Sequence, residues 1–365
     1  MSHAFTPLVA LLPTTVPFVG PEALERQCGV RIKARIGANE SVFGPSPKAI
    51  AAMRNAAAEV WKYGDPENHD LKAALAAHHG VRPQNIAAGE GIDALFGYLV
   101  RMFVEPGVTV ATSLGAYPTF NFHVLGYGGR LVTVPYRSDR EDPAALLDLA
   151  RRERARLIYF ANPDNPMGSW WDAATVRQMI AGVPEDALLC LDEAYVDFAP
   201  EGTAPPIEPD NPRVIRFRTF SKAHGMAGAR VGYAIGEAEL IGRFDAIRNH
   251  FGINRMAQAG ALASLGDTAH IAWVVNQVRE ARDRIAAIAA AAGLKVLPSA
   301  TNFVAVDCRR DGAFAKTVLD GLLARGIFVR MPGVAPLNRC IRVSAGTAED
   351  LDALEGALEP AVRGQ

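Results

Sequence analysis

The chain has 365 residues, of which 49% are hydrophobic and 21% charged, and its formal net charge is −1 at pH 7. This length predicts about two domains with a sizeable core, and the balanced charge argues against nucleic acid or an anionic membrane as a partner. The four cysteines form no CxxC pair, which is typical of isolated thiols in a reducing compartment.

The first 35 residues are rich in proline and short of periodicity, so we interpret residues 1–35 as an N-terminal arm or an element of a small domain. The apolar run 8–12 is short and follows no basic segment, which argues against a signal peptide. Across the chain, no apolar run approaches the roughly 20 residues that a membrane-spanning helix needs. We therefore expect a cytoplasmic protein without membrane attachment.

Residues 36–253 alternate helical and β-rich runs. Helices are predicted after Pro47 and over about 70–79, and another is predicted to run from the glycines at 89–91 to Phe103. Several of the predicted strands are apolar on both faces, as strands of a covered parallel sheet are. The six predicted strands are 108–112, 131–134, 156–161, 187–192, 214–219 and 231–235. The alternation predicts a large α/β domain.

The pattern changes at residue 254. A long alanine-rich helical region runs to Ala292, with Gly293 as a stop signal. Strands are then predicted near 302–307, 327–330 and 340–343, with a helix ending near Gly326 and a last helix after Thr347. Asp350, three residues after Thr347, predicts a capping box for that last helix. Residues 254–365 thus read as a smaller α+β domain.

The segment 218–230 places Lys222 between two predicted strands, after the hydroxyls of Thr219 and Ser221 and eight residues before Arg230. A lone lysine in a turn is most often solvated. In this setting, however, an amine suits covalent capture of an aldehyde whose phosphate is held by the hydroxyls and the arginine. That pattern indicates pyridoxal phosphate bound as a Schiff base.

Two motifs supply what the pyridine ring of that cofactor needs. Asp192 directly follows the run 187–191, and an acid at the carboxyl end of a central strand points into the crevice where α/β sheets bind ligands. Its carboxylate would keep the ring nitrogen protonated. Tyr195 could reach the ring hydroxyl, and the proline-rich turn 162–168 could aim Asn165 at a ring oxygen. Each alone is also compatible with an ordinary turn.

Three further features are weaker. Glycines at 89 and 91 precede a predicted helix, so free backbone N–H groups could approach a phosphate. The same run matches GxGxxA, the loose dinucleotide fingerprint, but no acid follows about 20 residues later.

Tyr117 could stack on a ring or pack in the core. Arg330 and Arg342, near strand ends, suit a carboxylate or phosphate or an ordinary surface. The chain contains no zinc-type cysteine spacing, HExxH, GxxxxGK[ST] or GxSxG motif.

Taken in this order, the motifs resemble the fold-type I aminotransferases that use pyridoxal phosphate, from Pro17 to Thr347. The nearest branch is histidinol-phosphate aminotransferase. The runs that carry the resemblance are 39–47, 63–66, 162–168, 192–198, 218–233, 301–304 and 341–347. The resemblance implies a large domain with a mostly parallel seven-stranded sheet between helices, plus a smaller α+β domain.

The resemblance also implies roles for individual residues. Lys222 would carry the cofactor and move a proton, Asp192 would pair with the ring nitrogen, and Tyr117 would stack on the ring. Asn165 and Tyr195 would bond the ring hydroxyl. The phosphate would be held at the turn after Gly91 by Ile92, Asp93, Thr219, Ser221 and Arg230. Tyr63 would reach the cofactor of a neighbouring subunit, which implies a homodimer with shared active sites. Substrate contacts would come from Phe18, Asn39, Phe120, Arg330 and Arg342.

The chain departs from the branch around the substrate. Phe18 and Phe120 stand where the branch commonly has tyrosines, Met167 replaces a threonine, and Trp170 and Trp171 add bulk. Lost hydroxyls and added aromatics predict a more apolar pocket. The favoured function is ping-pong transfer of an amino group from histidinol phosphate or an amino acid to a 2-oxo acid. The alternatives are an aromatic or broad-specificity aminotransferase, a decarboxylase of a phosphorylated amino acid, a dinucleotide-binding oxidoreductase and a non-catalytic binding module.

Overall fold

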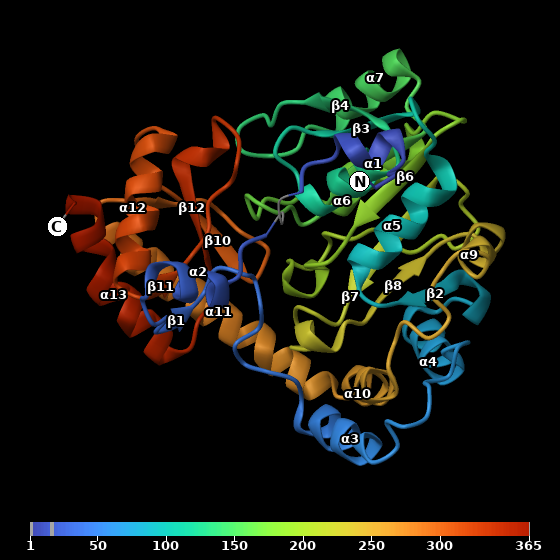
Figure 1. Ribbon diagram of the computed structural model, residues 1–365, viewed down its shortest axis with the longest axis horizontal. Coiled ribbons are helices and arrows are strands. Elements are labelled where there is room, and N and C mark those ends of the chain that lie inside the picture. Colours follow the sequence, from blue (N-terminus) through green and yellow to red (C-terminus); the bar gives the residue numbers. More distant parts are fainter. Residues whose placement is uncertain (1–2, 15–17, 365) are drawn as a thin grey trace.

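The computed structural model describes residues 3–14 and 18–364, so Pro17, where the resemblance begins, and the neighbouring part of the N-terminal arm lie outside the described residues. The larger unit is built on a seven-stranded sheet of order β2-β8-β7-β6-β5-β3-β4 (Figure 1). Its strands are β2 (Ile86–Gly89), β3 (Thr109–Ser113), β4 (Arg130–Val134), β5 (Leu157–Ala161), β6 (Leu188–Asp192), β7 (Val214–Thr219) and β8 (Gly232–Ile235). The five strands from β7 to β4 pair in parallel, and β8 pairs antiparallel with both β7 and β2. The predicted mostly parallel sheet is confirmed.

The sheet is covered on both faces, which explains why its strands carry few polar residues. One face, with Leu157 and Tyr159, packs against α5 (Ile92–Phe103) and α6 (Pro118–Gly126). The other face, with Ile158 and Phe160, packs against α7 (Pro143–Glu153) and α8 (Ala173–Ala181). Helix α9 (Ala238–Phe244) follows β8. Successive residues of a strand point to opposite faces, so apolar residues are needed along β5 and β6, apart from Asp192 at the end of β6.

The smaller unit contains the antiparallel sheet β12-β10-β9 and the short parallel pair β1-β11. Its strands are β1 (Ala34–Arg35), β9 (Lys295–Val296), β10 (Phe303–Asp307), β11 (Ile327–Phe328) and β12 (Cys340–Ser344), and its helices include α12 (Gly312–Ala324) and α13 (Ala348–Arg363). Because β1 pairs with β11, the end of the N-terminal arm is part of this unit. The capping box of α13 is confirmed, since Thr347 and Asp350 each accept from the other's backbone N–H.

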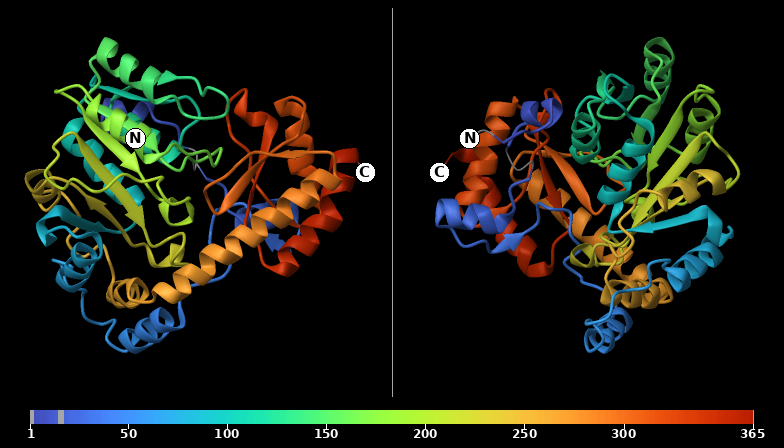
Figure 2. Two further views of the ribbon diagram at one scale, coloured as in Figure 1. Left: turned by 180° about the vertical axis from the view of Figure 1, so that it is seen from behind. Right: turned by 45° about the vertical axis from the view of Figure 1, so that its right-hand side comes forward.

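The alanine-rich region is two helices, α10 (Arg255–Leu265) and α11 (Thr268–Ala291), separated at Gly266 and Asp267. The Asp267 carboxylate pairs with Lys48 Nζ at 3.1 Å, which ties the break to α3 (Pro47–Ala57). Helix α10 packs against α3 and α4 (His69–His79), and α11 runs from there into the smaller unit (Figure 2). The division at residues 253 and 254 stays a prediction.

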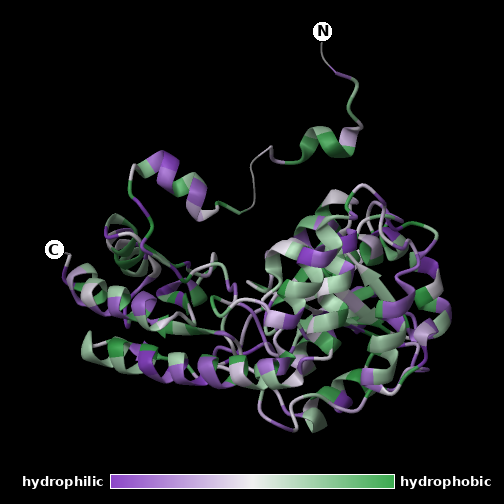
Figure 3. Ribbon diagram, turned by 90° about the horizontal axis from the view of Figure 1, so that it is seen from below, coloured by the Kyte–Doolittle hydropathy of each residue, from purple (hydrophilic) through white to green (hydrophobic). Residues whose placement is uncertain are grey.

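The N-terminal arm carries α1 (Pro7–Leu11) and α2 (Pro21–Cys28). Figure 3 shows α1 standing away from the rest of the chain, with an apolar surface. Phe5, Val9 and Leu11 are exposed on this segment. Among the described residues, no helix combines the length and the apolar character needed to cross a membrane.

Candidate active site

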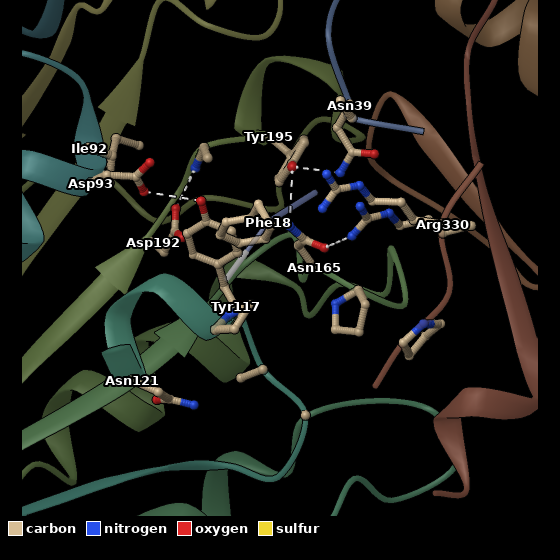
Figure 4. Close-up of a pocket in the computed structure, with 18 of the residues that line it drawn as sticks. Phe18, Asn39, Ile92, Asp93, Tyr117, Asn121, Asn165, Asp192, Tyr195 and Arg330 are labelled. Atoms are coloured by element: carbon tan, nitrogen blue, oxygen red, sulfur yellow. Dashed lines mark hydrogen bonds between the residues drawn. The ribbon is translucent and has the colours of Figure 1, made fainter. Parts of the chain in front are cut away.

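A cavity of about 610 Å³ opens between the carboxyl ends of the large sheet and the smaller unit (Figure 4). Residues from both units line it, as expected for the crevice of an α/β sheet. The predicted site residues in its lining are Phe18, Asn39, Ile92, Asp93, Tyr117, Asn165, Asp192, Tyr195, Thr219, Ser221, Lys222, Arg230, Arg330 and Arg342. Segments nearly the whole chain apart therefore meet at one place.

Asp192 is the last residue of β6 and is buried at the base of the cavity. Its Oδ2 accepts a hydrogen bond from the Tyr159 hydroxyl at 2.6 Å, and its Oδ1 accepts from the Ala194 N–H at 2.9 Å. Burial raises the pKa of Asp192 to about 6, while these two hydrogen bonds and Lys222 act in the opposite direction. A cationic group of a ligand in the cavity would therefore favour the ionised form of Asp192 over the neutral acid.

Lys222 follows β7 and points into the same cavity. Its Nζ donates to the Asn39 carbonyl at 2.9 Å and lies 5.4 Å from the centre of the Tyr195 ring. The same carbonyl accepts from Asn302 Nδ2 at 3.1 Å. Burial, helped by the nearby Arg342 guanidinium, lowers the pKa of Lys222 to about 8. The amine is thus more readily neutral, and so nucleophilic, than an exposed lysine.

A chain of side chains joins the two units beside Lys222. The Tyr195 hydroxyl accepts from Asn39 Nδ2 at 3.0 Å and from Asn165 Nδ2 at 3.4 Å. Asn165 Oδ1 in turn accepts from Arg342 Nη1 at 2.5 Å (Figure 4). Asn39 comes from the N-terminal segment, Asn165 from the turn after β5, and Arg342 from β12. These polar groups can bond a ring oxygen and a carboxylate in the cavity.

The start of α5 contributes Ile92 and Asp93 to the lining of the cavity. Gly91 has φ of +92°, and a Cβ there would collide with the Arg230 guanidinium. A Cβ at Gly232 would lie 2.7 Å from the Ile92 nitrogen. No described side chain caps α5, so its first N–H groups face the cavity beside Arg230. Thr219 and Ser221 add hydroxyls. Backbone donors, a helix N-terminus and an arginine fit a dianionic phosphate.

Tyr117 is the residue before α6 and forms one wall of the cavity. Its hydroxyl donates to Asp93 Oδ1 at 3.1 Å, which fixes the ring near the start of α5. The Phe18 ring lies 6.4 Å from it in a stacked arrangement. The Arg330 guanidinium lies 5.2 Å from the Phe18 ring, and its Nη2 donates to the Val19 carbonyl. A flat ligand could lie against Tyr117 with its anionic end near Arg330.

Phe120 does not contact the cavity, contrary to the sequence prediction. It is fully buried in the core, where it stacks on Tyr159 at 4.6 Å and meets Phe96 edge-on. Three residues after Tyr117, it lies on the face of α6 that packs against the sheet. Its missing hydroxyl therefore has no direct bearing on a substrate.

Met167, Trp170 and Trp171 also lie away from the cavity. Met167 packs with Leu297 and Leu337 between the two units. Trp171 Nε1 donates to the Glu141 carbonyl at 2.9 Å, and the Arg140 guanidinium lies over both tryptophans. The interpretation that these residues make the pocket apolar is wrong. Of the departures noted above, Phe18 is the one in the cavity lining.

Tyr63 lies outside the lining of this cavity. Its side chain is 75% exposed and stacks on Phe251, with ring centres 4.5 Å apart. The contact with a neighbouring subunit stays a prediction.

Several residues at the site are not identified by sequence reasoning. Tyr159 bonds Asp192, Asn302 shares the Asn39 carbonyl with Lys222, and Asn121 lines the cavity with a buried Oδ1 that has no described partner. One available signal is the tyrosine within the otherwise apolar strand 157–161. Asn302 lies within a run that carries the resemblance, which assigns it no role.

The glycine turn is not a dinucleotide site. The strand before it, β2, is an edge strand that pairs with the antiparallel β8, and the next strand along the chain, β3, lies five positions away in the sheet. A dinucleotide fingerprint requires a βαβ unit of neighbouring parallel strands.

Comparisons with known proteins show which family the chain matches. The family model for aminotransferase class I and II matches residues 31–358. A histidinol-phosphate aminotransferase of Anaeromyxobacter sp. (strain Fw109-5) is 37% identical over 358 residues, covering 96% of this chain and 97% of the relative. One from Moorella thermoacetica is 33% identical, covering 94% and 89%.

Solved structures give the same result. The crystal structure of histidinol-phosphate aminotransferase from Sinorhizobium meliloti in complex with pyridoxal-5'-phosphate superimposes with a TM-score of 0.97 at 56% identity, covering 100% of this chain and 98% of that one. Aspartate aminotransferase from Thermus thermophilus with maleate shares the fold, with a TM-score of 0.81 at 22% identity and 100% coverage of both chains.

Proposed function

This chain belongs to the class I and II aminotransferase family, and from that premise we propose that it transfers the amino group of histidinol phosphate to a 2-oxo acid. It is a pyridoxal-phosphate-dependent transaminase. The proposed donor rests on the names of its relatives and on the charge of its cavity. The observation that carries it is a pair of arginines facing one cavity.

Arg330 and Arg342 are held side by side by their backbones. The Arg342 N–H donates to the Arg330 carbonyl at 2.6 Å, and the Arg330 N–H donates to the Arg342 carbonyl at 3.2 Å. Both side chains reach the cavity. The Arg330 guanidinium lies 5.2 Å from the centre of the Phe18 ring and 5.6 Å from the centre of the Phe328 ring, and these contacts help to position it. One guanidinium suits a donor phosphate and the other suits the carboxylate of a 2-oxo acid.

The bound cofactor supplies an aldehyde for amine capture and a ring that spreads negative charge. The chain supplies the remaining functions. Lys222 Nζ would carry a proton from the amine-bearing carbon of the donor to the bound cofactor in the first half-reaction. In the second half-reaction it would carry a proton to the reacting carbon of the 2-oxo acid. Asp192 would hold the ring nitrogen, and Asn165 with Tyr195 would hold the ring oxygen. The start of α5 and Arg230 would hold the phosphate end, which would fix the reacting atoms beside Lys222.

We expect the rate at which the apo-protein takes up pyridoxal phosphate to rise with pH, with a midpoint near 8. The neutral Lys222 amine is the reactive form, and burial lowers its pKa to about 8. Below that pH the amine is protonated, and above it the rate reaches a plateau. Stopped-flow absorbance measures this rate. In Arg342→Gln the midpoint should move upward, because a nearby cation is removed. A midpoint at the ordinary lysine value of 10.5 would contradict the geometry.

The donor is tested by following the first half-reaction by absorbance with histidinol phosphate, histidinol, phenylalanine and tyrosine. We expect histidinol phosphate to react best. In Arg330→Gln its KM should rise about 10- to 100-fold, the loss expected for one charged hydrogen bond. The KM for histidinol, which lacks the phosphate, should stay the same. An equal loss for both donors would show that Arg330 does not bind the phosphate.

An aromatic amino acid is the second candidate donor. Phe18 favours it, because this ring offers no hydroxyl to a phosphate and stacks near Tyr117 at the cavity. Rapid reaction with phenylalanine and none with histidinol phosphate would establish this alternative, and the transaminase assignment would remain.

We further propose that the active protein is a homodimer in which Tyr63 completes the site of the partner. Apolar side chains around Tyr63 are unusually exposed for a monomer surface, including Trp61 at 77% and Val60 at 58%. The apolar segment with α1 also stands free of its own chain (Figure 3). A second copy would bury both surfaces.

Mixed dimers of Lys222→Ala and Tyr63→Ala subunits test this arrangement. If Tyr63 serves the partner, one site of each mixed dimer contains both unaltered residues. Activity should then exceed that of either variant alone after co-refolding and separation by differential tags. If Tyr63 serves its own subunit, mixing restores nothing.

A further inference from the structure

Tyr159 lies behind Asp192 in the large sheet, and none of the roles assigned above uses it. It is on β5, directly beside β6 in the parallel register that pairs Tyr159 with Cys190 and Ala161 with Asp192. Its hydroxyl therefore reaches diagonally across the strand pair to Asp192 Oδ2, 2.6 Å away. Together with the Ala194 N–H on Oδ1, it gives each carboxylate oxygen a protein donor.

The Tyr159 ring is held by aromatic neighbours on the same sheet face. Phe120 stacks on it with ring centres 4.6 Å apart, and Phe96 meets it edge-on at 5.7 Å. The side chain is fully buried. A buried hydroxyl needs a partner, and here that partner is a carboxylate at the end of a strand. The contacts with Phe120 and Phe96 therefore leave the Tyr159 hydroxyl little freedom to move away from Asp192.

The groups around Asp192 have opposing effects on its ionisation, so the hydrogen bond from Tyr159 contributes to the balance. The charged and titratable groups that face it are Tyr159 from β5, Asp93 from α5, Lys222 after β7, and Glu141 and Asp164 from adjoining loops, with Cys190 and Tyr195 close in sequence. Burial and Asp93 disfavour the ionised carboxyl, whereas Tyr159, Ala194 N–H and Lys222 favour it. Removing the Tyr159 hydroxyl would shift this balance toward the neutral acid.

We propose that Tyr159 is a positioning residue that keeps the Asp192 carboxylate ionised and directed at the ring nitrogen of the cofactor. The inference rests on the role proposed for Asp192. A neutral or rotated Asp192 carboxyl would hold a protonated ring nitrogen poorly, which would weaken both cofactor binding and proton removal from the substrate.

The test compares Tyr159→Phe with Tyr233→Phe. The control also loses a buried tyrosine hydroxyl of the same sheet, one that bonds His79 at 2.9 Å and lies outside the lining of the cavity. Both variants should lose similar thermal stability. In Tyr159→Phe alone, we expect the dissociation constant of pyridoxal phosphate to rise about 10- to 100-fold, with a fall in kcat and an unchanged KM for the donor. The acid limb of the pH profile should move to higher pH.

A cofactor analogue provides a readout independent of turnover. The 1-deaza analogue of pyridoxal phosphate has carbon in place of the ring nitrogen, so Tyr159→Phe and the unaltered chain should bind it equally. In a chain that already carries Asp192→Asn, adding Tyr159→Phe should cost little further affinity for pyridoxal phosphate, because both changes act on one contact. Unchanged cofactor affinity and pH profile in Tyr159→Phe would overturn the proposal. So would a loss of affinity for the analogue as large as the loss for pyridoxal phosphate.

The outcome also separates this inference from the role of Asp192 itself. If Asp192→Asn binds the cofactor as well as the unaltered chain, the ring-nitrogen role fails. If Asp192→Asn binds weakly while Tyr159→Phe does not, the ring-nitrogen role stands and Tyr159 merely packs.

Discussion

Replacing Lys222 by alanine is expected to reduce kcat for transamination by about 10⁴-fold or more, because in the proposed mechanism this one side chain serves as both nucleophile and proton carrier. Among the described residues that line the cavity, the other Lys and Arg side chains are Arg230, Arg330 and Arg342, whose guanidiniums cannot give up a proton at neutral pH. Steady-state assays with the best donor measure the loss. Added ethylamine should restore part of the rate by carrying the proton through solution.

A second readout locates the covalent bond. Borohydride reduction of the holoenzyme should add the cofactor mass to the peptide that contains Lys222, and the Lys222→Ala variant should gain none. Lys316→Ala is the matched control, since Lys316 is an exposed lysine paired with Asp320 on α12. It should keep the label and the full rate. A label on another lysine would contradict the assignment of Lys222.

Replacing Asp192 by asparagine is the second large effect that we expect. The dissociation constant of pyridoxal phosphate should rise roughly 30- to 5,000-fold, the range for removing one partner of a buried charge pair. The amide keeps the shape of the side chain, so the loss reports the charge. Absorbance titration of the apo-protein measures the affinity, and kcat should fall as well because the ring becomes a weaker electron acceptor.

Asp172→Asn is the control for this experiment. Asp172 caps α8 by accepting a hydrogen bond from the Thr175 N–H, lies outside the cavity lining, and can be replaced by asparagine as a cap. It should leave cofactor affinity unchanged. Full affinity and full rate in Asp192→Asn would remove Asp192 from the site.

Strands and helices were predictable where one local pattern dominates. The predicted strand 187–192 corresponds to β6 (Leu188–Asp192), because a strand covered on both faces needs apolar side chains and residues 188–191 supply them. The break between α10 and α11 was missed, because an alanine-rich pattern fits one long helix as well as two. Contact of Asp267 with Lys48 on α3 marks the break, and that contact joins residues distant in sequence.

The wrong predictions at the site concern the direction in which a side chain points. Phe120 follows Tyr117 by one helical turn, yet Tyr117 faces the cavity and Phe120 faces the sheet. The rotation of α6 about its axis, set by packing on β5, decides which side chain a ligand meets. Trp171 was assigned to the pocket for its bulk, but its indole N–H is committed to the Glu141 carbonyl behind the turn.

The sequence by itself determined the cofactor chemistry, because Lys222, its hydroxyls and Arg230 lie within one short segment and Asp192 ends a recognisable strand. Only the tertiary structure decided how reactive that lysine is and which residues surround a substrate. The Lys222 pKa depends on burial and on Arg342, and its amine is held by the Asn39 carbonyl. Electrostatics and hydrogen bonding act through distance in space, so residues 39, 222 and 342 influence one another only after the chain has folded.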